Sequence, residues 1–555
     1  MTSDCTEAPD AVPRPVTGPR VARLAQQLEA APDAAARDAL TEAFWAEVEA
    51  TGAPLVEELD DAPGHRAVTF LWRGHRATRR VLLMAPGITD RDRLADALLH
   101  RLPGTDVWHL GRRLRADHRG SYRLVADISP GSAPVDPALL QRRLLALRAH
   151  GGADPLNPDR IPARWRTAQG SVFALPDAPP QPWTTARPTG VPRGGVERHT
   201  LAAGALGVER DVLVYLPPDA APSESADAPS RPADVMPHRA AHEPGERGRL
   251  PLLVLCDGDM WFGRLGLQDT LDALIADGVL PPLAVLAPDA VDSATRWREL
   301  GGREGYVSFL ADEAVPWAQA RWPLTARADR TVVAGQGLGG MTALYAGLTR
   351  PERFGRVLAQ SPALWWRPGL EPGAPAPDEI GTPWLATLAA GLRDKLPDGE
   401  GTRRGEGGRS GERGRSAERG RRGEGGQHAE HIKHAEHIEH TQHAEHTEHI
   451  KHAEHSQPGR RGAVVHLDVG LHEGPLVEHS EALSAVLRAR GHQVARTVHN
   501  GGHDYACWRG SLADALVELL GAHLDVDAAE SQGGTGLPRH AAGCSSGLPA
   551  GPAVR

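Results

Sequence analysis

One short segment limits the fold of this 555-residue chain more than any other. Residues 331–333 are β-branched (Thr-Val-Val), a glycine-rich turn follows at 335–340, and residues 341–348 have the composition of a helix. A strand that passes through a tight turn into a helix is the repeating unit of sheets covered by helices. We therefore expect an α/β domain, and the residues of the turn indicate which kind.

The turn has the frame of a nucleophile elbow. In α/β-hydrolases the motif G-x-S-x-G places a serine at such a strand-to-helix turn. Here Gly335 and Gly339 stand at the two glycine positions, but Gly337 stands at the serine position. The turn retains the frame that presents a nucleophile and lacks the hydroxyl group that would attack.

A dinucleotide-binding loop is the competing interpretation, because Gly335, Gly337 and Gly340 also satisfy G-x-G-x-x-G. That motif needs an acidic residue about 20 positions later, at the end of the next strand. The next expected strand, 356–360, ends in a Ser-Pro pair without a carboxylate. The nucleotide interpretation is the weaker of the two.

Composition argues against several classes of function. The net charge of −9 argues against nucleic-acid binding. No stretch approaches the ~18 apolar residues of a membrane span, and the polar start has no apolar signal segment. The four cysteines form no C-x-x-C pair, which fits a reducing compartment. We expect a cytoplasmic protein that binds neither nucleic acid nor membrane.

The N-terminal third changes its hydrophobic period. Apolar residues recur at helical spacing within 21–48, and the period then changes towards two. The expected strands are 67–72, 81–84 and 121–125. Without a long helical pattern between them, a small antiparallel β-sandwich is expected. We place a disordered tail at 1–17 and this domain, with its helical lead-in, at 18–185.

From residue 196, strands alternate with helical stretches. The expected strands are 212–216, 252–256, 283–287, 331–334, 357–360, 464–469 and 494–498. This alternation predicts a mostly parallel sheet with flanking helices. We assign an α/β-hydrolase domain to 190–397 and 462–525, and a second disordered tail to 526–555.

A low-complexity insertion at 398–461 interrupts this domain. After a part rich in Gly, Arg and Glu, ten histidines recur at every third position from His428 to His455. Such a period makes one stripe on a polyproline II helix but not on an α-helix. Dense imidazole groups can bind Zn²⁺, Ni²⁺ or Cu²⁺, although a tandem expansion without function is the interpretation that we favour. No metal is expected to take part in catalysis.

Several segments resemble the enterochelin esterases, which are cytoplasmic hydrolases that open ferric trilactone siderophores. Residues 330–361 (RTVVAGQGLGGMTALYAGLTRPERFGRVLAQS) resemble the elbow region of that family. The other matching segments are GTDVW (104–108), RGSY (119–122), ADPLNP (153–158), CDGDMW (256–261), DAVDSATRWREL (289–300) and GGHDYACWR (501–509). Their order and spacing match those of the family, so the resemblance implies a β-sandwich followed by an α/β-hydrolase.

Hydrolysis by acyl transfer needs a nucleophile, a base, an orienting acid and an oxyanion hole. After the elbow, one expected strand leads to Glu473 and the next leads to His503, in the chain order of α/β-hydrolases. The resemblance identifies His503 as the catalytic histidine. Glu473 is the expected acid, with Asp468 as the competing candidate, and Gly337 takes the nucleophile position.

The substrate that the resemblance implies is a small molecule, a strongly anionic ferric tris-catecholate. Arginines are therefore expected at the mouth of the site, first Arg296 and then Arg298, because guanidinium groups suit oxyanions. Trp261, Trp365 and Trp366 are candidates to face the catechol rings, with core packing as the alternative. Backbone N–H groups of Leu338 and Gly258 are expected to form the oxyanion hole. No cofactor is expected, since iron enters with the substrate.

The resemblance predicts an esterase, and the glycine at the elbow sets the main alternative. Glycine relieves the backbone strain of an elbow, so the fold is expected to survive. A catalytically impaired member of the family, which binds ferric siderophores or partners without turnover, is the first alternative. A dinucleotide-binding protein is the second.

Overall fold

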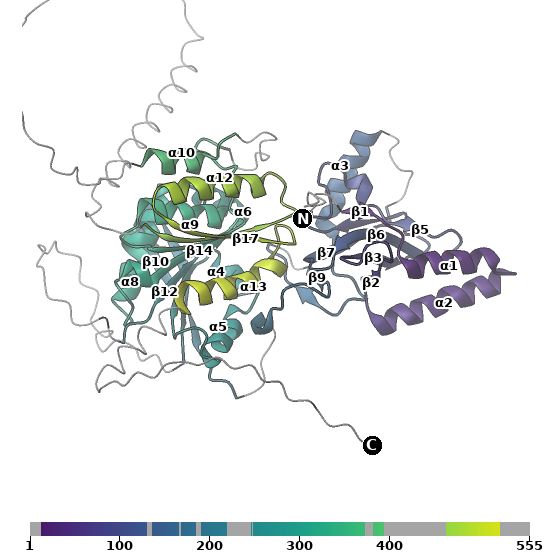
Figure 1. Cartoon of the computed structure of the whole chain (residues 1–555), viewed down its shortest axis with the longest axis horizontal. Coiled ribbons are helices and arrows are strands. Elements are labelled where there is room, and N and C mark those ends of the chain that lie inside the picture. The colour runs from purple at the N-terminus through teal and green to yellow at the C-terminus, as the bar shows by residue number, and fades with distance from the viewer. Residues whose placement is uncertain are drawn as a thin grey trace, which may run out of the picture.

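The computed structural model of the chain describes residues 13–129, 136–165, 168–184, 190–218, 246, 248–371, 381–392 and 462–521. The described residues form two lobes (Figure 1). The N-terminal lobe contains antiparallel sheets with two helices at one end, and the larger lobe contains an eight-stranded sheet between helices.

The helical spacing near the N-terminus corresponds to two helices, α1 (Pro19–Ala30) and α2 (Ala34–Thr51). The side chain of Asp33 caps α2 by accepting a hydrogen bond of 2.8 Å from the N–H of Ala36. Leu24, Trp45 and Val48 are buried in one cluster with the neighbouring strands. The helical lead-in is therefore packed against the sandwich.

Two antiparallel sheets form the rest of this lobe. One contains β1 (Arg14–Pro15), β6 (Val107–Arg115), β3 (His65–Arg73) and β2 (Leu55–Glu58), with β5 (His100–Arg101) paired to β6. The other contains β4 (Arg80–Met84), β7 (Arg119–Asp127), β9 (Gly170–Ala174) and β8 (Arg160–Ile161). Both sheets contribute to one apolar core, for example with Phe70, Leu83 and Tyr122. The expected antiparallel architecture is confirmed.

Two features of this lobe differ from the prediction. Residues 13–17 were assigned to the disordered tail, but Arg14–Pro15 pairs with β6 and the N–H of Val16 donates to the carbonyl of Gly111. Pairing through the backbone at a sheet edge needs no apolar side chain, so the polar composition hid it. In addition, α3 (Pro137–Leu147) lies between β7 and β8, where no helix was expected. Residues 1–12, the insertion at 398–461 and the tail at 526–555 lie outside the described residues.

The larger lobe is built on one mixed sheet in the order β10-β11-β13-β12-β14-β15-β16-β17. The strands are β10 (Gly195–Ala203), β11 (Val208–Leu216), β12 (Leu252–Leu255), β13 (Ala284–Pro288), β14 (Thr331–Gln336), β15 (Arg356–Gln360), β16 (Val464–Gly470) and β17 (Gln493–His499). From β13 to β17 all neighbours are parallel, whereas β10 and β11 are antiparallel. All seven expected strands are present. The edge strand β10 was missed because most of its side chains are not buried.

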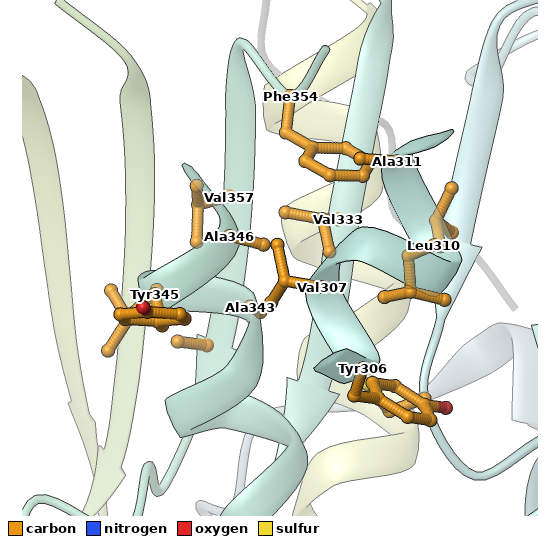
Figure 2. Close-up of a cluster of buried hydrophobic side chains, with 14 of the residues drawn as sticks. Tyr306, Val307, Leu310, Ala311, Val333, Ala343, Tyr345, Ala346, Phe354 and Val357 are labelled. Carbon is orange, nitrogen blue, oxygen red and sulfur yellow. The ribbon is translucent and has the colours of Figure 1, made fainter. Parts of the chain in front are cut away.

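Helices cover both faces of this sheet. One face packs against α5 (Leu267–Ala276) and α13 (Tyr505–Leu516), and the other against α7 (Glu304–Ser308), α9 (Leu338–Thr349), α10 (Trp384–Gly391) and α12 (Leu476–Ala489). Figure 2 shows the second core, where Val307 meets Val333 and Ala343. The residues of α9 from Leu338 to Leu348 are all buried. This packing fixes the helix that follows the elbow.

Candidate active site

The elbow lies where β14 ends and α9 begins. Gly337 has φ 58° and ψ −116°, outside the regions that residues with a side chain adopt without strain. Its N–H donates to the carbonyl of Gln360, and its carbonyl accepts from Ala363 at 2.9 Å. Neighbouring backbone therefore holds this residue in the conformation expected of a nucleophile elbow, although no nucleophile is attached.

A histidine and a glutamate face the elbow. The Nδ1 atom of His503 lies 2.8 Å from Oε2 of Glu473, and the histidine side chain is half-exposed while the carboxylate is buried. A Cβ built on Gly337 would lie 3.2 Å from Nε2 of His503. The imidazole is thus oriented by the carboxylate on one nitrogen and directed at position 337 with the other.

The buried carboxylate of Glu473 is stabilised in its ionised form. Burial raises its pKa, but the charge and hydrogen bond of His503, together with bonds from Ser361 and the N–H of Gly470, hold the pKa below its ordinary value. Ser361, at φ 43°, also accepts a bond from Trp508 Nε1. Glu473 therefore keeps a negative charge to orient His503, and Ser361 supports that carboxylate.

Asp468, the competing acid, has another partner. Its Oδ1 lies 2.8 Å from Nδ1 of His499, and its Oδ2 accepts from Ser511 at 2.6 Å. Burial raises the pKa of Asp468, but the hydrogen bond and charge of His499 lower it below the ordinary value. The carboxylate that contacts His503 is that of Glu473. The catalytic role of the pair remains a prediction.

The expected oxyanion donors lie beside the elbow. Leu338 is the first residue of α9, a position whose N–H has no acceptor within the helix. Gly258 begins the short helix α4 (Gly258–Trp261) after β12, and a Cβ there would lie 2.2 Å from the carbonyl oxygen of Ala287. Strands β12 and β14 are paired up to Leu255 and Ala334, so both turns leave adjacent strands at the same edge.

The structure gives Arg296 a different task from the predicted one. Its guanidinium donates to both carboxylate oxygens of Asp257, at 2.9 and 2.8 Å, and to the carbonyl of Gln336 at 3.0 Å. Arg296 therefore ties the turn after β12 to the elbow instead of standing at the mouth as an anion ligand. Arg298 donates to Thr295 Oγ1 and lines a surface cavity of about 790 Å³.

Two of the three candidate tryptophans are core residues. Trp261 is almost fully buried, and its Nε1 donates to Gln336 Oε1 at 2.8 Å. Trp366 is buried against Trp384, with ring centroids 5.2 Å apart, and contributes to the wall of the same cavity. For these two, core packing replaces the predicted substrate contact. Trp365 is partly buried and stacks on Trp297.

Sequence reasoning missed one charged residue beneath the turn at 257–259, Arg164. Asp257 is fully buried, and besides Arg296 it contacts Arg164 of the N-terminal lobe at 2.7 Å. The segment CDGDMW indicated the turn itself, but nothing in the sequence distinguished Arg164 from the many other arginines of the chain. Its contact depends on how the two lobes pack.

Among the residues that the structure describes, His, Cys, Asp and Glu side chains form no group of three or more that could hold a metal ion. The histidine tract lies outside them. Within the same part of the chain, every helix is too short or too polar to cross a membrane.

Comparisons with known proteins lead to one family. The family "Enterochelin esterase, N-terminal" matches residues 67–184, and the family "Putative esterase" matches residues 236–519. An iron(III) salmochelin esterase of Escherichia coli is 30% identical over 482 residues, covering 86% of this chain and 93% of the relative. An iron(III) enterobactin esterase of Dickeya dadantii is 32% identical over 500 residues, with the same coverage.

Solved structures lead to the same family. The ferric enterobactin esterase from Salmonella typhimurium superposes with a TM-score of 0.59 at 26% identity, covering 87% of this chain and all of that one. The enterobactin esterase from Shigella flexneri, crystallised in the presence of enterobactin, gives 0.57 at 25% identity, covering 86% of this chain and 97% of that one. The fold is that of an α/β-hydrolase with an N-terminal antiparallel domain. The chain belongs to the enterochelin esterase family, and this membership favours the esterase-elbow interpretation of the turn at 335–340 over the nucleotide loop.

Proposed function

We propose that this protein is a cytoplasmic carboxylic-ester hydrolase that opens ferric catecholate trilactone siderophores and thereby releases iron. One observation carries the proposal. The His503–Glu473 pair is intact and directed at position 337, with Nε2 of the histidine 3.2 Å from where a Cβ would stand. A base oriented by a buried carboxylate beside two turns with directed N–H groups is the arrangement that ester hydrolysis needs.

With glycine at the elbow, water is the nucleophile. His503 accepts a proton from water at Nε2 while the water oxygen attacks the ester carbonyl carbon. The N–H groups of Leu338 and Gly258 stabilise the resulting oxyanion. The intermediate then collapses, the C–O bond to the alcohol breaks, and His503 returns the proton to the leaving oxygen. The products are a carboxylic acid and an alcohol, and no acyl-enzyme forms.

The substrate class rests on the relatives. The relatives named above are esterases of iron(III) salmochelin and iron(III) enterobactin. The cavity of about 790 Å³ described above is lined by carboxylates (Glu299, Glu304) as well as by Arg298 and Arg303, and no residue of the elbow or of the His503–Glu473 pair lines it. Iron would enter as part of this substrate, without a resident cofactor.

Restoring the nucleophile tests the proposal. The variant Gly337→Ser should raise kcat towards a ferric catecholate trilactone by at least ~10²-fold, because acyl transfer to serine replaces direct attack by water. Product should be quantified by chromatography of the released catechol-serine fragments. Gly337→Ser combined with His503→Ala is the matched control and should remain near background. A folded serine variant that binds the ferric substrate without hydrolysing it would contradict the proposal.

Binding without turnover is the second candidate, and Gly337 itself favours it. A chain that lacks the attacking hydroxyl can still hold the ligand, since the turns around the elbow do not depend on that oxygen. Titration of the Gly337 protein with a ferric catecholate, followed by recovery of intact trilactone after many hours, would support this candidate. Measurable hydrolysis above the uncatalysed rate would exclude it.

A further inference from the structure

One arginine connects the N-terminal lobe to the esterase site. Arg164 follows β8, and its side chain is only 12% exposed. Its Nη1 lies 2.7 Å from Oδ2 of Asp257, and its Nη2 lies 3.2 Å from Oδ1 of Asp259. Nη1 also donates to the hydroxyl of Tyr505 at 3.0 Å. All three partners belong to the larger lobe.

The acceptor of this contact shapes the turn after β12. Asp257 has φ 70°, a left-handed conformation that a residue with a side chain rarely adopts. It immediately precedes Gly258, and a Cβ on Gly339 of the elbow would lie 3.7 Å from its Oδ2. Arg296 donates to both oxygens of the same carboxylate. Two guanidinium groups, one from each lobe, therefore hold the strained residue before the expected oxyanion donor.

The charges around the turn are balanced only when both arginines are present. Burial alone would raise the pKa of Asp257, but the charges of Arg296 and Arg164 lower it to about 2. Asp259 adds a second carboxylate that Arg164 contacts. Without Arg164, Arg296 alone would face two carboxylates next to the place where negative charge develops during ester hydrolysis.

A second route runs from the same arginine towards the base. Tyr505 packs edge-to-face on Trp508 with ring centroids 4.9 Å apart, and Trp508 packs edge-to-face on the imidazole of His503 at 4.6 Å. Nearby, the N–H of Ser121 in β7 donates to Asp504, the residue after His503 in the chain. The N-terminal lobe thus contacts both sides of the elbow.

We propose that Arg164 is a positioning residue for ester hydrolysis, through which the N-terminal lobe completes the active site. This inference rests on the proposed function. Arg164 fixes the backbone of residues 257–259, so that the N–H of Gly258 is directed at the oxyanion, and it keeps the turn from becoming net negative. Its removal should lower kcat much more than it raises KM. The oxyanion is absent from the bound substrate and forms only during the chemical step.

The N-terminal lobe offers a matched control. Asp127 is buried like Asp257 and is also flanked by two arginines, Arg143 at 3.0 Å and Arg80 at 3.5 Å. All three residues lie in the N-terminal lobe. Arg143→Met and Arg164→Met therefore each remove one of two arginines from a buried aspartate, but only the second disturbs the esterase turn.

Kinetics in the Gly337→Ser background provide the first test. Arg164→Met should lower kcat about 10- to 100-fold, which is less than the typical loss of an oxyanion donor itself, while KM changes less than about threefold. Arg164→Lys should recover part of the loss because it restores the charge without the two-pronged geometry. Arg143→Met should leave kcat within about twofold. A kcat for Arg164→Met within twofold of its parent, or an equal loss in Arg143→Met, would overturn the proposal.

Amide hydrogen exchange in the unaltered Gly337 chain separates this proposal from the function. If Gly337→Ser hydrolyses nothing, the proposed function fails, but the exchange of amides at 257–261 still reports on the turn. Faster exchange there in Arg164→Met than in Arg143→Met, at equal global stability, supports the positioning role. Equal exchange in the two variants overturns it.

Discussion

Two carboxylate–histidine pairs stand at the same edge of the sheet, and they differ in what surrounds them. In each pair, the carboxylate lies near the end of β16 and the histidine lies at or just after the end of β17. The distance from Nδ1 to the carboxylate oxygen is 2.8 Å in both Glu473–His503 and Asp468–His499. His503 is 48% exposed and directed at the elbow, whereas His499 is 15% exposed. The distance between the partners is identical, so access to the elbow separates a candidate base from a structural ion pair.

The largest expected effect is on turnover. In the Gly337→Ser background, His503→Ala should lower kcat by about 10³-fold or more, since the serine loses its base. His499→Ala should stay within about tenfold per folded molecule, because His499 does not face the elbow. The folded fraction of each preparation can be measured by circular dichroism and used to normalise kcat. Equal losses in the two variants would mean that the comparison between the pairs is wrong.

Stability should respond in the opposite order. His499→Ala leaves the buried Asp468 without its cationic partner and should lower the free energy of unfolding by about 3–5 kcal/mol. His503→Ala should cost less than about 1 kcal/mol, because Glu473 keeps its bonds from Ser361 and Gly470. Urea unfolding followed by tryptophan fluorescence measures both. A larger loss in His503→Ala would contradict the assignment.

The pH dependence sharpens the comparison further. Burial lowers the pKa of His499, but the hydrogen bond and charge of Asp468, with a contribution from Cys507, raise it from 6.5 to about 11. The folded state then retains a proton that the unfolded chain releases above pH 6.5. The resulting stabilisation is complete below pH 6.5 and is lost as the pH rises towards 11, at up to ~1.4 kcal/mol per pH unit.

His499→Gln should therefore flatten the decline of stability between pH 7 and 10. Glu473 acts with the opposite sign: its lowered pKa contributes stability that is present above pH 4.5 and is lost at lower pH. Melting temperatures of wild type and His499→Gln between pH 7 and 10 test the first statement, and those of wild type below pH 4.5 test the second. An unchanged slope in the variant would show that another group controls the alkaline limb.

The smallest expected effect is that of removing the low-complexity insertion. Deletion of residues 398–461 should leave the melting temperature nearly unchanged, because the entropy of closing a loop depends weakly on its length. Isothermal titration with Zn²⁺ before and after deletion shows whether the histidine tract binds metal. A large fall in melting temperature would contradict the interpretation as a solvated expansion.

The sequence predicted the frame of the site better than its supports. The order of strands, the elbow and the approach of Glu473 and His503 follow from hydrophobic period and motif spacing, which are local signals. The choice between Glu473 and Asp468 depends on the three-dimensional structure, because both carboxylates lie close to the end of one strand. Arg296 and Trp366 were misplaced since sequence reveals that a side chain is cationic or aromatic, but not what it faces. Arg164 depends on contacts between lobes and left no pattern to detect.

The backbone at position 337 has a consequence for how this family can evolve. A serine there must tolerate strain, whereas glycine adopts φ 58° and ψ −116° at little cost. Selection for folding therefore does not oppose the change from serine to glycine, and the codons AGC and GGC differ by one base. The same single step in reverse restores a hydroxyl to a frame that has been kept intact. A lineage can thus lose the nucleophile and regain it, while every intermediate remains a folded protein.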